Sequence, residues 1–573
     1  MAHQAAPTRA SGLNDDPFTQ LGELPERVNI AQFLPSLAAR EPSKLAVRVA
    51  AGEPDALKFD DISYAELDPR SDAIAAGLMR RGLQRGDRVC VFVKPGIDLI
   101  AVTFGLLKAA AVPVLIDPGM GREALLSCVE RMQPKAFVGI PLAHALRKVF
   151  RKPFKTVKLT LTVGKRWFWG GPTLDQLLAE HDHQPVLIDT AASDEAAILF
   201  TSGSTGPAKG VVYTHGMFHA QVLALKKLYA FGDDETDAAC FPLFALFSPA
   251  LEMTCVFPEL DPSKPASCDP ERIVAAIQRT GATSTFGSPA IWRRVVPWCI
   301  ENKVKLPTLR RVLIAGAPVP PSIIEGFRQV LNADADVHTP YGATESLPVS
   351  SMAGREVLDV TAQRSASGAG TCVGRQAPGI DLRIIRVTDE SIARWSDDLE
   401  LPRGQIGEIT VLGPVVTHQY KFEAQHTAAT KIDHSSRVRH RLGDLGYVDA
   451  NGRLWFLGRK SHRLETANGM LPTVGIEGIF NTHPRVHRTA LVGVGPAGEE
   501  RPYLWVEPKA DEFPANEAAK QRFTDELRDH AAKHPAAAVV EGILFHKGFP
   551  VDVRHNAKIH RGTLKREAQE QLA

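Results

Sequence analysis

Residues 62–96 read ISYAELDPRSDAIAAGLMRRGLQRGDRVCVFVKPG, and this stretch decides the fold. Its apolar residues first recur at the spacing of one helix face, then a basic turn with Gly and Asp follows, and 89–93 form a short apolar strand. Similar strands beside amphipathic helical stretches recur at 112–116, 135–139, 196–200, 284–286 and 311–315. Alternating helices and strands predict an α/β fold with a largely parallel sheet.

The pattern changes after about Ala377. The segments GIDLRIIRV (379–387) and GQIGEITVLGP (404–414) are short strands separated by Gly and Pro turns, which predicts an antiparallel subdomain. DANGRLWFLGRK (449–460) indicates a hairpin turning at Asn451-Gly452. We therefore expect three parts: a disordered N-terminus (1–24), a large domain (25–457), and a small mobile α+β C-terminal domain (458–573) with its hinge near 458–461.

Composition excludes several classes of protein. The charge of +2 comes from 67 basic and 65 acidic residues and provides no overall field for nucleic acid or an anionic membrane. The seven cysteines are scattered and contain no CxxC pair, which argues against a disulfide framework and structural zinc and favours a reducing cytoplasm. Residues 1–24 lack the apolar core of a signal peptide. Residues 99–116 contain Lys108 and Pro113, so they predict a helix running into a buried strand rather than a membrane span.

The most informative segment is ILFTSGSTGPAKGV (198–211), a buried strand followed by small and hydroxyl residues and then a lysine. Small residues let backbone N–H groups approach phosphate oxygens, and Ser202, Ser204 and Thr205 add hydroxyl donors. Lys209 supplies positive charge for the outer phosphates. The spacing is not that of a Walker loop. A flexible surface turn is the alternative for a short Gly/Ser-rich loop taken alone.

TSGSTGPAKG is close to the signature of the ANL superfamily, which comprises acyl-CoA synthetases, adenylation domains of nonribosomal peptide synthetases and luciferases. The resemblance runs from Ile62 to Lys565 through several motifs in the family's order. It implies the ANL fold, and it implies ATP and Mg²⁺ as cofactors. The nucleotide-binding residues that it implies in the first two motifs, TSGSTGPAKG and AGAPV, are Thr201, Ser202, Gly203, Ser204, Thr205, Gly206, Lys209, Gly316, Ala317 and Pro318.

Two further motifs resemble the segments that hold the nucleotide. In TPYGATE (339–345), the resemblance implies that Tyr341 stacks on adenine, Gly342 and Thr344 contact the nucleotide, and Glu345 holds Mg²⁺ between phosphate oxygens. In RLGDLGYVD (441–449), Asp444 would accept hydrogen bonds from both ribose hydroxyls. Arg459 would contact ribose or the α-phosphate. Taken alone, such a Tyr, Glu or Asp is more often a structural residue in a loop or turn.

The resemblance also implies three catalytic residues: Lys558, Glu345 and Thr205. Lys558, in FPVDVRHNAKIHRGTLK (549–565), would bridge the substrate carboxylate and the α-phosphate. Its neighbours depart from the family pattern because His-Asn-Ala precedes the lysine where Ser-Gly is usual. Lys565 is the solvated alternative. At the hinge, Ser461 stands where the family often has Asp, which puts the thiol-transfer half-reaction in doubt.

The segment that corresponds to the acyl-binding part of the family also departs from the family pattern. In PLFALFSPALEM (242–253), Ala245 occupies a position that is histidine in many acyl-CoA synthetases. The apolar run 241–251 either lines a long-chain tunnel or packs in the core. This segment, TPYGATESLPV (339–349) and GVVYTHGMFHAQV (210–222) are together most similar to the β-lactone synthetases of bacterial long-chain olefin biosynthesis.

That subfamily resemblance implies activation of a long-chain 2-alkyl-3-hydroxyalkanoic acid as its adenylate, followed by attack of the 3-hydroxyl to give a β-lactone. It also implies that the protein acts in the same pathway as a thiolase-like condensing enzyme, a reductase and a β-lactone decarboxylase. His215 and His219 lie near the phosphate loop, but the base for lactonisation stays unassigned. The alternatives are a medium- or long-chain acyl-CoA synthetase, a ligase for a carrier protein, and a catalytically inactive nucleotide-binding protein.

Overall fold

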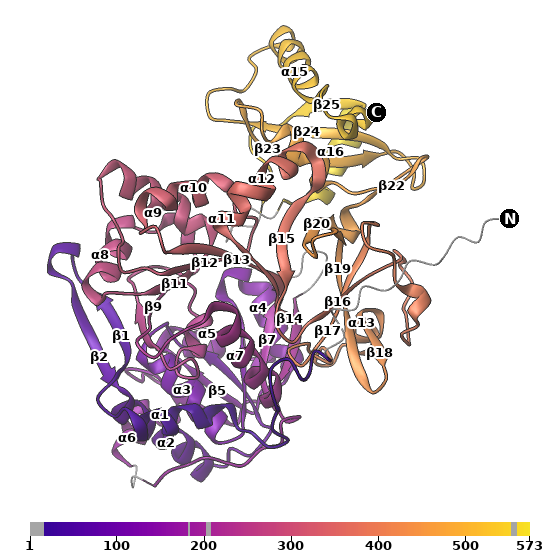
Figure 1. Ribbon diagram of the computed structural model, residues 1–573. Helices are drawn as coiled ribbons and strands as arrows, with labels where there is room; N and C mark the ends of the chain where they lie inside the picture. Colours follow the sequence, from indigo (N-terminus) through magenta and orange to yellow (C-terminus); the bar gives the residue numbers. More distant parts are fainter. Residues whose placement is uncertain (1–15, 181–183, 202–207, 552–558, 573) are drawn as a thin grey trace.

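The computed structural model describes residues 16–180, 184–201, 208–551 and 559–572. Figure 1 shows a large body built around two sheets, with a smaller C-terminal unit above it. The chain order of the first sheet follows the predicted alternation of helix and strand.

A six-stranded sheet forms the base of the body, in the order β6-β5-β3-β4-β7-β8. Its strands are β3 (Arg88–Phe92), β4 (Val112–Leu115), β5 (Ala136–Gly139), β6 (Leu159–Thr162), β7 (Glu195–Thr201) and β8 (Lys209–Thr214). β3 to β7 pair in parallel, and β8 returns antiparallel to β7. The helices in this part of the chain are α1 (Phe33–Arg40), α2 (Tyr64–Arg80), α3 (Ile97–Lys108), α4 (Arg122–Met132), α5 (Pro141–Val149), α6 (Leu174–Ala179) and α7 (His215–Tyr229). The predicted parallel α/β arrangement is therefore confirmed here.

A 14-stranded sheet runs through the rest of the body, in the order β16-β17-β19-β20-β15-β14-β13-β12-β11-β9-β10-β1-β2, with β18 beside β19. Its half from β1 to β13 is mainly parallel and comprises β1 (Leu45–Ala51), β2 (Lys58–Ser63), β9 (Thr236–Ala239), β10 (Thr254–Phe257), β11 (Ser284–Gly287), β12 (Arg311–Ile314) and β13 (Asp336–Ala343). The helices between these strands are α8 (Pro270–Thr280), α9 (Pro289–Glu301) and α10 (Pro321–Val330).

The other half of this sheet is antiparallel, as the sequence predicts. Its strands are β14 (Ser346–Ala353), β15 (Thr371–Gln376), β16 (Asp381–Ile385), β17 (Gly407–Leu412), β18 (Lys431–His434), β19 (Arg437–Val448) and β20 (Leu454–Arg459). Short helices α11 (Gly354–Glu356), α12 (Ala362–Arg364) and α13 (Ala424–Thr430) accompany them. The predicted Asn451-Gly452 turn joins β19 to β20, and Gly452 has a φ of 73°, a conformation that suits glycine.

The C-terminal unit has a sheet and a core of its own. A small hairpin of β21 (Leu464–Thr466) and β22 (Gly469–Leu471) precedes the sheet of β23 (Val486–Val494), β24 (Arg501–Pro508) and β25 (Gly542–Phe545). The helices are α14 (Val474–Phe480), α15 (Glu517–Ala531) and α16 (Arg561–Leu572). Phe523 and Leu527 of α15 are buried against this sheet. A separate α+β unit agrees with the expected architecture, whereas its mobility and its boundary near residue 458 stay predictions.

Residues 16–24 are the described part of the N-terminal segment that we expect to be disordered, and they pack against the large body. Leu21 is buried among side chains of α7 and the antiparallel strands. The Arg437 guanidinium donates two hydrogen bonds of 2.8 Å to the Asp16 carboxylate and lies 4.1 Å from the centroid of the Phe18 ring. One apolar anchor and one bidentate ion pair are enough to hold a polar segment whose composition gave no sign of either.

Residues 97–116 form α3 followed by β4, as the sequence predicts. The buried Lys108 ammonium lies 2.5 Å from the Asp68 carboxylate and 2.6 Å from that of Asp72, which satisfies its charge inside the body. Across the described ranges, every helix is either too short or too polar to traverse a bilayer.

Candidate active site

The predicted phosphate loop connects two paired strands. β7 leads into it and β8 leaves it, and Thr201 and Lys209 are register partners at its base. Burial lowers the pKa of Lys209, while the charges of Glu345 and Glu423 oppose that shift. Lys209 is therefore partly desolvated beside two carboxylates. The predicted binding residues Ser202, Gly203, Ser204, Thr205 and Gly206 lie outside the described residues.

Three predicted nucleotide residues meet across strands β13, β19 and β20. The Tyr341 hydroxyl donates a hydrogen bond of 2.5 Å to Asp444 Oδ2, and Arg459 Nη1 lies 2.9 Å from Asp444 Oδ1. Asp444 and Arg459 are register partners, which fixes their approach. Burial raises the pKa of Asp444, whereas the Arg459 charge and the Tyr341 hydroxyl pull that pKa down. The result is a buried carboxylate held in place from both sides.

Tyr341 lies in a strand, at a bulge of the β13–β14 hairpin. Its ring is 6.0 Å from the ring of Phe456. The neighbouring Gly342 has no space for a side chain, because a Cβ there would lie 2.5 Å from the carbonyl oxygen of Ser346. Glycine thus permits the two strands to come together beside the tyrosine.

The turn after β13 presents Thr344 and Glu345. The Tyr213 hydroxyl donates to the carbonyl of Thr344. Tyr420 donates a hydrogen bond of 2.7 Å to Glu345 Oε1, and the backbone N–H of Thr417 donates one of 2.9 Å to the carbonyl of Glu345. Two distant segments thereby hold this turn, and the Tyr420 hydroxyl positions the Glu345 carboxylate through Oε1.

Tyr420, Thr417 and Lys431 belong to this site, although the sequence reasoning did not identify them. The Lys431 ammonium is buried; it donates a hydrogen bond of 2.5 Å to the carbonyl of Thr417 and lies 5.6 Å from the centroid of the Tyr420 ring. Burial lowers the pKa of Lys431 to about 7, against the opposing charge of Glu345. A lysine at an inward-facing position of a short strand was the signal that could have revealed it.

Gly316, Ala317 and Pro318 follow the carboxyl end of β12, the strand that pairs with β13. Gly316 has a φ of 92° and so turns the chain in a conformation that suits glycine. This places the segment at the end of the strand that neighbours β13, which carries Tyr341.

The segment 241–251 contributes to an aromatic cluster that leads away from Thr344. The ring of Tyr213 stacks on Phe218 at 4.8 Å, and Phe218 lies 5.9 Å from Phe247. Phe244 in turn lies 4.7 Å from Phe286. Ala245 and Leu251 are fully buried and serve packing, whereas Phe244 and Phe247 keep partial exposure. Core packing therefore accounts for Ala245 and Leu251, whereas a substrate tunnel lined by Phe244 and Phe247 stays a prediction.

The two histidines near the phosphate loop are held in structural roles. His215 is buried and its Nδ1 accepts a hydrogen bond of 3.1 Å from the backbone of Ile30, and burial lowers the pKa of His215 to about 4. His219 stacks on Phe33 at 5.7 Å. Neither arrangement singles out a base for lactonisation.

Near the C-terminus, the predicted catalytic Lys558 lies outside the described residues. The alternative, Lys565 on α16, forms an ion pair with the buried carboxylate of Glu500. That pairing gives Lys565 a role in holding α16 to the C-terminal sheet.

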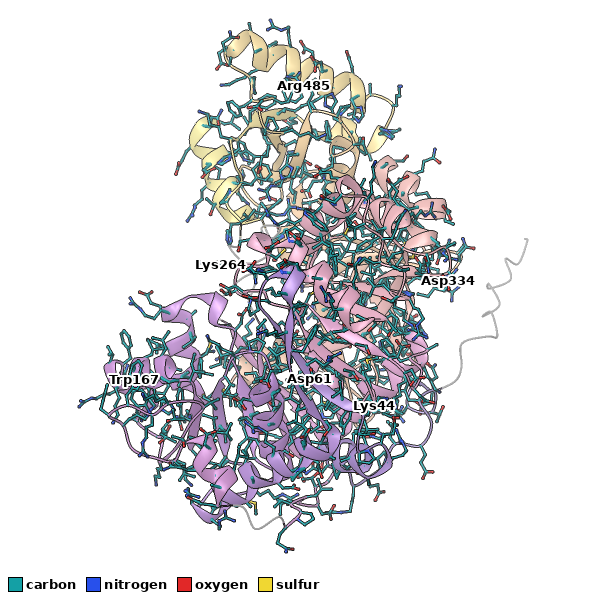
Figure 2. The ribbon with its side chains drawn as sticks, turned by 90° about the vertical axis from the view of Figure 1, so that its left-hand side faces the viewer. Lys44, Asp61, Trp167, Lys264, Asp334 and Arg485 are labelled. Atoms are coloured by element: carbon teal, nitrogen blue, oxygen red, sulfur yellow. The ribbon has the colours of Figure 1, made fainter. Side chains whose placement is uncertain are left out.

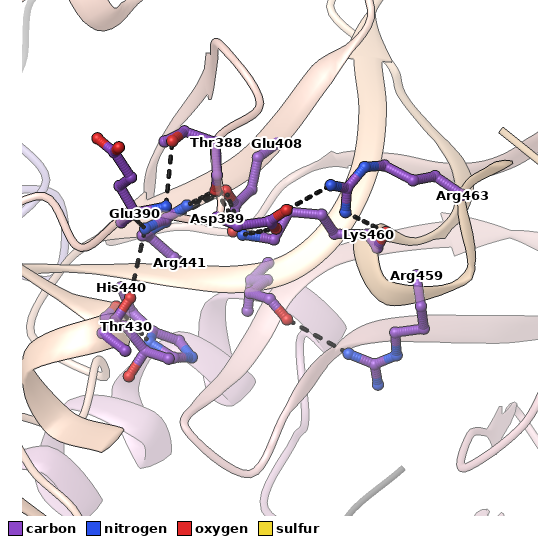
Figure 3. A network of polar contacts seen from close by, with 12 residues as sticks. Thr388, Asp389, Glu390, Glu408, Thr430, His440, Arg441, Arg459, Lys460 and Arg463 are labelled. Atoms are coloured by element: carbon purple, nitrogen blue, oxygen red, sulfur yellow. Dashed lines mark hydrogen bonds and ion pairs between the residues drawn. The ribbon is translucent and has the colours of Figure 1, made fainter. Parts of the chain in front are cut away.

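A polar network holds the chain where it leaves β20, at the expected hinge (Figure 3). Arg441 and Glu408 form a fully buried ion pair of 2.6 Å, and Lys460 adds a contact of 3.2 Å to the same carboxylate. Arg463 lies 2.5 Å from Asp389 Oδ2. Basic residues on both sides of Ser461 are thus tied to the antiparallel subdomain, although Ser461 replaces the acidic residue frequent in the family.

Comparison with known proteins gives a consistent result over most of the chain. A family model described as AMP-binding enzyme matches residues 37–421. The olefin beta-lactone synthetase of Xanthomonas campestris pv. campestris is 46% identical over 558 residues, covering 95% of this chain and 98% of that protein. The enzyme of the same name from Stenotrophomonas maltophilia is 47% identical over 94% of this chain and 97% of its own length.

Solved structures resemble the fold at lower identity. ATP-bound MatB from Rhodopseudomonas palustris superposes with a TM-score of 0.75 at 23% identity, covering 95% of this chain and 100% of that one. The amide bond synthetase McbA from Marinactinospora thermotolerans gives a TM-score of 0.76 at 21% identity, covering 94% and 99%. These matches confirm the expected fold class.

Proposed function

The chain belongs to the family of AMP-binding enzymes, and from that premise we propose that it converts a long-chain 2-alkyl-3-hydroxyalkanoic acid into a β-lactone at the expense of ATP. The observation that carries the proposal is the similarity, along nearly the whole chain, to two proteins named olefin beta-lactone synthetase. The reaction runs in two steps. A carboxylate oxygen attacks the α-phosphate and pyrophosphate leaves; then the 3-hydroxyl attacks the acyl carbonyl and AMP leaves.

The residues around Asp444 support the nucleotide end of this proposal. A carboxylate has four acceptor positions, and one contact at each oxygen leaves capacity for the two ribose hydroxyls. In our assignment Asp444 accepts from the ribose, Arg459 holds that carboxylate and reaches toward the α-phosphate, and the Tyr341 ring stacks on adenine.

Glu345 is the residue that we assign to Mg²⁺. Mg²⁺ prefers oxygen ligands and is commonly held by one or two carboxylates together with phosphate oxygens. Tyr420 fixes Glu345 Oε1, so the carboxylate is held in position before the metal binds. When bound, Mg²⁺ neutralises phosphate charge. Lys209, whose ammonium is influenced by the charge of Glu345, would hold the outer phosphates, and Thr344 would also contact phosphate.

The aromatic cluster supports a long alkyl substituent. It begins at Tyr213, which contacts the carbonyl of Thr344, and continues through Phe218, Phe247 and Phe244. A chain laid along the partly exposed rings of Phe218, Phe247 and Phe244 would have its carboxylate near Thr344, where the α-phosphate is expected. Burial of apolar carbon against the rings provides the affinity.

Lactonisation needs no thiol acceptor because the nucleophile is part of the substrate. An oriented intramolecular nucleophile reaches effective molarities on the order of 10⁵ M, and AMP is a good leaving group. We further propose that the enzyme works in the cytoplasm, consistent with seven unpaired, buried cysteines, beside a thiolase-like enzyme, a reductase and a β-lactone decarboxylase.

The test is to incubate the purified protein with Mg²⁺, ATP and a long-chain 2-alkyl-3-hydroxy acid, with and without coenzyme A, and to follow products by NMR without heating. We expect AMP and a β-lactone in equal amounts whether or not coenzyme A is present. A thioester that forms solely with coenzyme A would replace the lactone proposal with an acyl-CoA synthetase while keeping the adenylation step.

A further inference from the structure

The loop after β6 exposes two large aromatic side chains next to each other. Trp167 is 56% exposed and Phe168 is 75% exposed. Figure 2 shows Trp167 at the outer edge of the large body. Single exposed apolar residues are ordinary, but adjacent exposed aromatic rings at a loop tip are characteristic of an interaction surface.

This loop is anchored from beneath rather than loosely attached. Trp169 is 2% exposed, donates a hydrogen bond of 2.9 Å to Thr162 Oγ1 and stacks on His144 of α5 at 5.2 Å. Gly171 has a φ of 93°, and a Cβ there would lie 2.2 Å from Thr160 Oγ1, so the return of the loop requires glycine. The buried tryptophan therefore holds its two neighbours, Trp167 and Phe168, outward in a defined position.

Helix α5 adds exposed apolar side chains beside the loop. Leu142 is 70% exposed and Val149 is 73% exposed. The stacking of His144 on Trp169 shows that α5 and the loop are direct neighbours. Four exposed apolar side chains are thus contributed by two adjoining segments.

The same part of the chain is strongly basic. Residues 141–171 contain eight Lys or Arg and no Asp or Glu, in a protein whose overall charge is +2. Those that are exposed are Lys148, Arg151, Lys152, Lys155, Lys158, Lys165 and Arg166. Lys152 pairs with Glu130 at 3.2 Å, which neutralises one of these charges.

Acidic residues bound this surface on one side. Val163 and Gly164 also line a hollow of about 820 Å³ whose walls carry Asp60, Asp61, Glu66 and Asp98. Arg48 pairs with Asp61 at 2.9 Å and Arg70 pairs with Asp98 at 2.7 Å. Two of the four carboxylates are thus neutralised by arginines, so the hollow offsets the positive charge of the loop and α5 only in part.

We propose that residues 141–171 form a docking surface for an anionic lipid bilayer, and we call this the 141–171 surface. Aromatic rings settle at the boundary between headgroups and acyl chains, and Lys and Arg beside them are attracted to anionic headgroups. The two features occur together here on one anchored loop and its neighbouring helix. Charge complementarity selects the lipid surface over an uncharged apolar partner.

The experiment measures binding of the full chain to vesicles by co-sedimentation, without ATP or substrate, so that its outcome is independent of the proposed reaction. The vesicles are phosphatidylcholine with about 30% phosphatidylglycerol, or phosphatidylcholine alone. We expect binding to the anionic vesicles that weakens at high salt, and much weaker binding to the neutral ones. Tryptophan emission should shift to the blue with anionic vesicles and should shift less in Trp167→Ala.

Two sets of variants separate the contributions. Trp167→Ala with Phe168→Ala should lower the binding constant at least about tenfold by removing the inserted rings. Replacement of Lys148, Lys155 and Lys165 by Gln should lower it on the order of 100-fold, at about tenfold or less per charge. The control for the aromatic pair is Val360→Ala with Ile406→Ala, and the control for the lysines is replacement of Lys303, Arg403 and Lys533 by Gln. All five residues are exposed and lie outside the 141–171 surface, so both control variants should bind like the unmodified protein.

Three outcomes would overturn the proposal. The first is absence of binding to anionic vesicles at low salt. The second is equal loss of binding in the control variants. The third is a concentration-dependent dimer, seen by analytical ultracentrifugation, that Trp167→Ala with Phe168→Ala dissociates while vesicle binding is unchanged; this would assign the surface to a second copy of the chain.

Discussion

The nucleotide end and the acyl end of the candidate site are built in opposite ways. At the nucleotide end, charged and hydroxyl groups are buried on β13 and on strands of the antiparallel half-sheet, with Asp444 between Tyr341 and Arg459. At the acyl end, rings such as Phe244 and Phe286 pack edge to face and carry no charge. Burying a charged group destabilises the folded protein unless the group is paired, whereas burying an aromatic ring stabilises it. The polar end is therefore the chemically specific part of the site, and the aromatic end contributes binding and stability.

The largest expected effect concerns Lys431 and stability. The pKa of this ammonium falls from 10.5 to about 7 in the folded protein because burial disfavours the charged form. The unfolded state then binds more protons between pH 7 and 10.5, so the free energy of unfolding contributed by this group rises with pH in that window. Replacement by Met removes this pH dependence, which amounts to as much as about 5 kcal/mol.

Urea denaturation of Lys431→Met and the unmodified protein at several pH values measures this difference. The free energy of unfolding of the variant, minus that of the unmodified protein, should fall as the pH rises from 7 toward 10, because only the unmodified protein gains stability in that window. A constant difference across that range would mean that Lys431 keeps its ordinary pKa and that the nucleotide end is better solvated than its burial indicates.

Asp444→Asn should be the most damaging change to activity at the nucleotide end. It keeps the shape of the side chain but removes the charge facing Arg459 and weakens two hydrogen bonds to ribose, so we expect kcat/KM for ATP to fall on the order of 10³-fold. Pyrophosphate release measures the change. The matched control is Asp433→Asn on the exposed side of β18, which should leave kcat/KM unchanged. A loss below about threefold in Asp444→Asn would remove Asp444 from the ribose site.

Phe244→Ala tests the acyl end. Removing one partly buried ring should raise KM for a long-chain acid about thirtyfold while KM for ATP stays the same. A matched control is Phe59→Ala on β2, a ring of similar partial exposure away from the site. An equal rise of both KM values in Phe244→Ala would contradict the assignment of Phe244 to acyl binding alone.

Tyr420→Phe has the smallest expected effect and tests how Glu345 is positioned. Loss of the 2.7 Å hydrogen bond should raise the Mg²⁺ concentration for half-maximal activity about tenfold, because a hydrogen bond to a charged acceptor contributes about 1.5 kcal/mol or more. Titration of activity with Mg²⁺ measures it. Tyr447→Phe, which loses a hydrogen bond to the carbonyl of Ala369, is the control. An unchanged Mg²⁺ requirement in Tyr420→Phe would separate Tyr420 from the metal site.

Sequence alone predicted the parts of the molecule that depend on short motifs. The strands at 112–116, 136–139 and 311–314 follow from local apolar patterns, and Tyr341, Asp444 and Arg459 followed from motif resemblance and meet in space. Each of these residues lies in a contiguous motif, so local reading was sufficient to choose them. Lys558 and most of the phosphate loop lie outside the described residues, and their roles stay predictions.

The remaining features depend on contacts between distant segments. Thr417, Tyr420 and Lys431 reach Glu345 from about 70 to 86 positions further along the chain, and no short motif marks them. The packing of Leu21 likewise depends on α7 and on strands of the antiparallel subdomain. Such residues become visible when the fold brings their segments together, which local patterns do not specify.

The most direct test of the central claim follows oxygen from the substrate. A 2-alkyl-3-hydroxy acid labelled with ¹⁸O at both carboxyl oxygens is incubated with the protein, Mg²⁺ and ATP, without coenzyme A, and AMP and lactone are analysed by mass spectrometry. Adenylation followed by attack of the 3-hydroxyl predicts one label in AMP and one in the lactone carbonyl. Unlabelled AMP would contradict the account, because the carboxylate would then never have been joined to the α-phosphate.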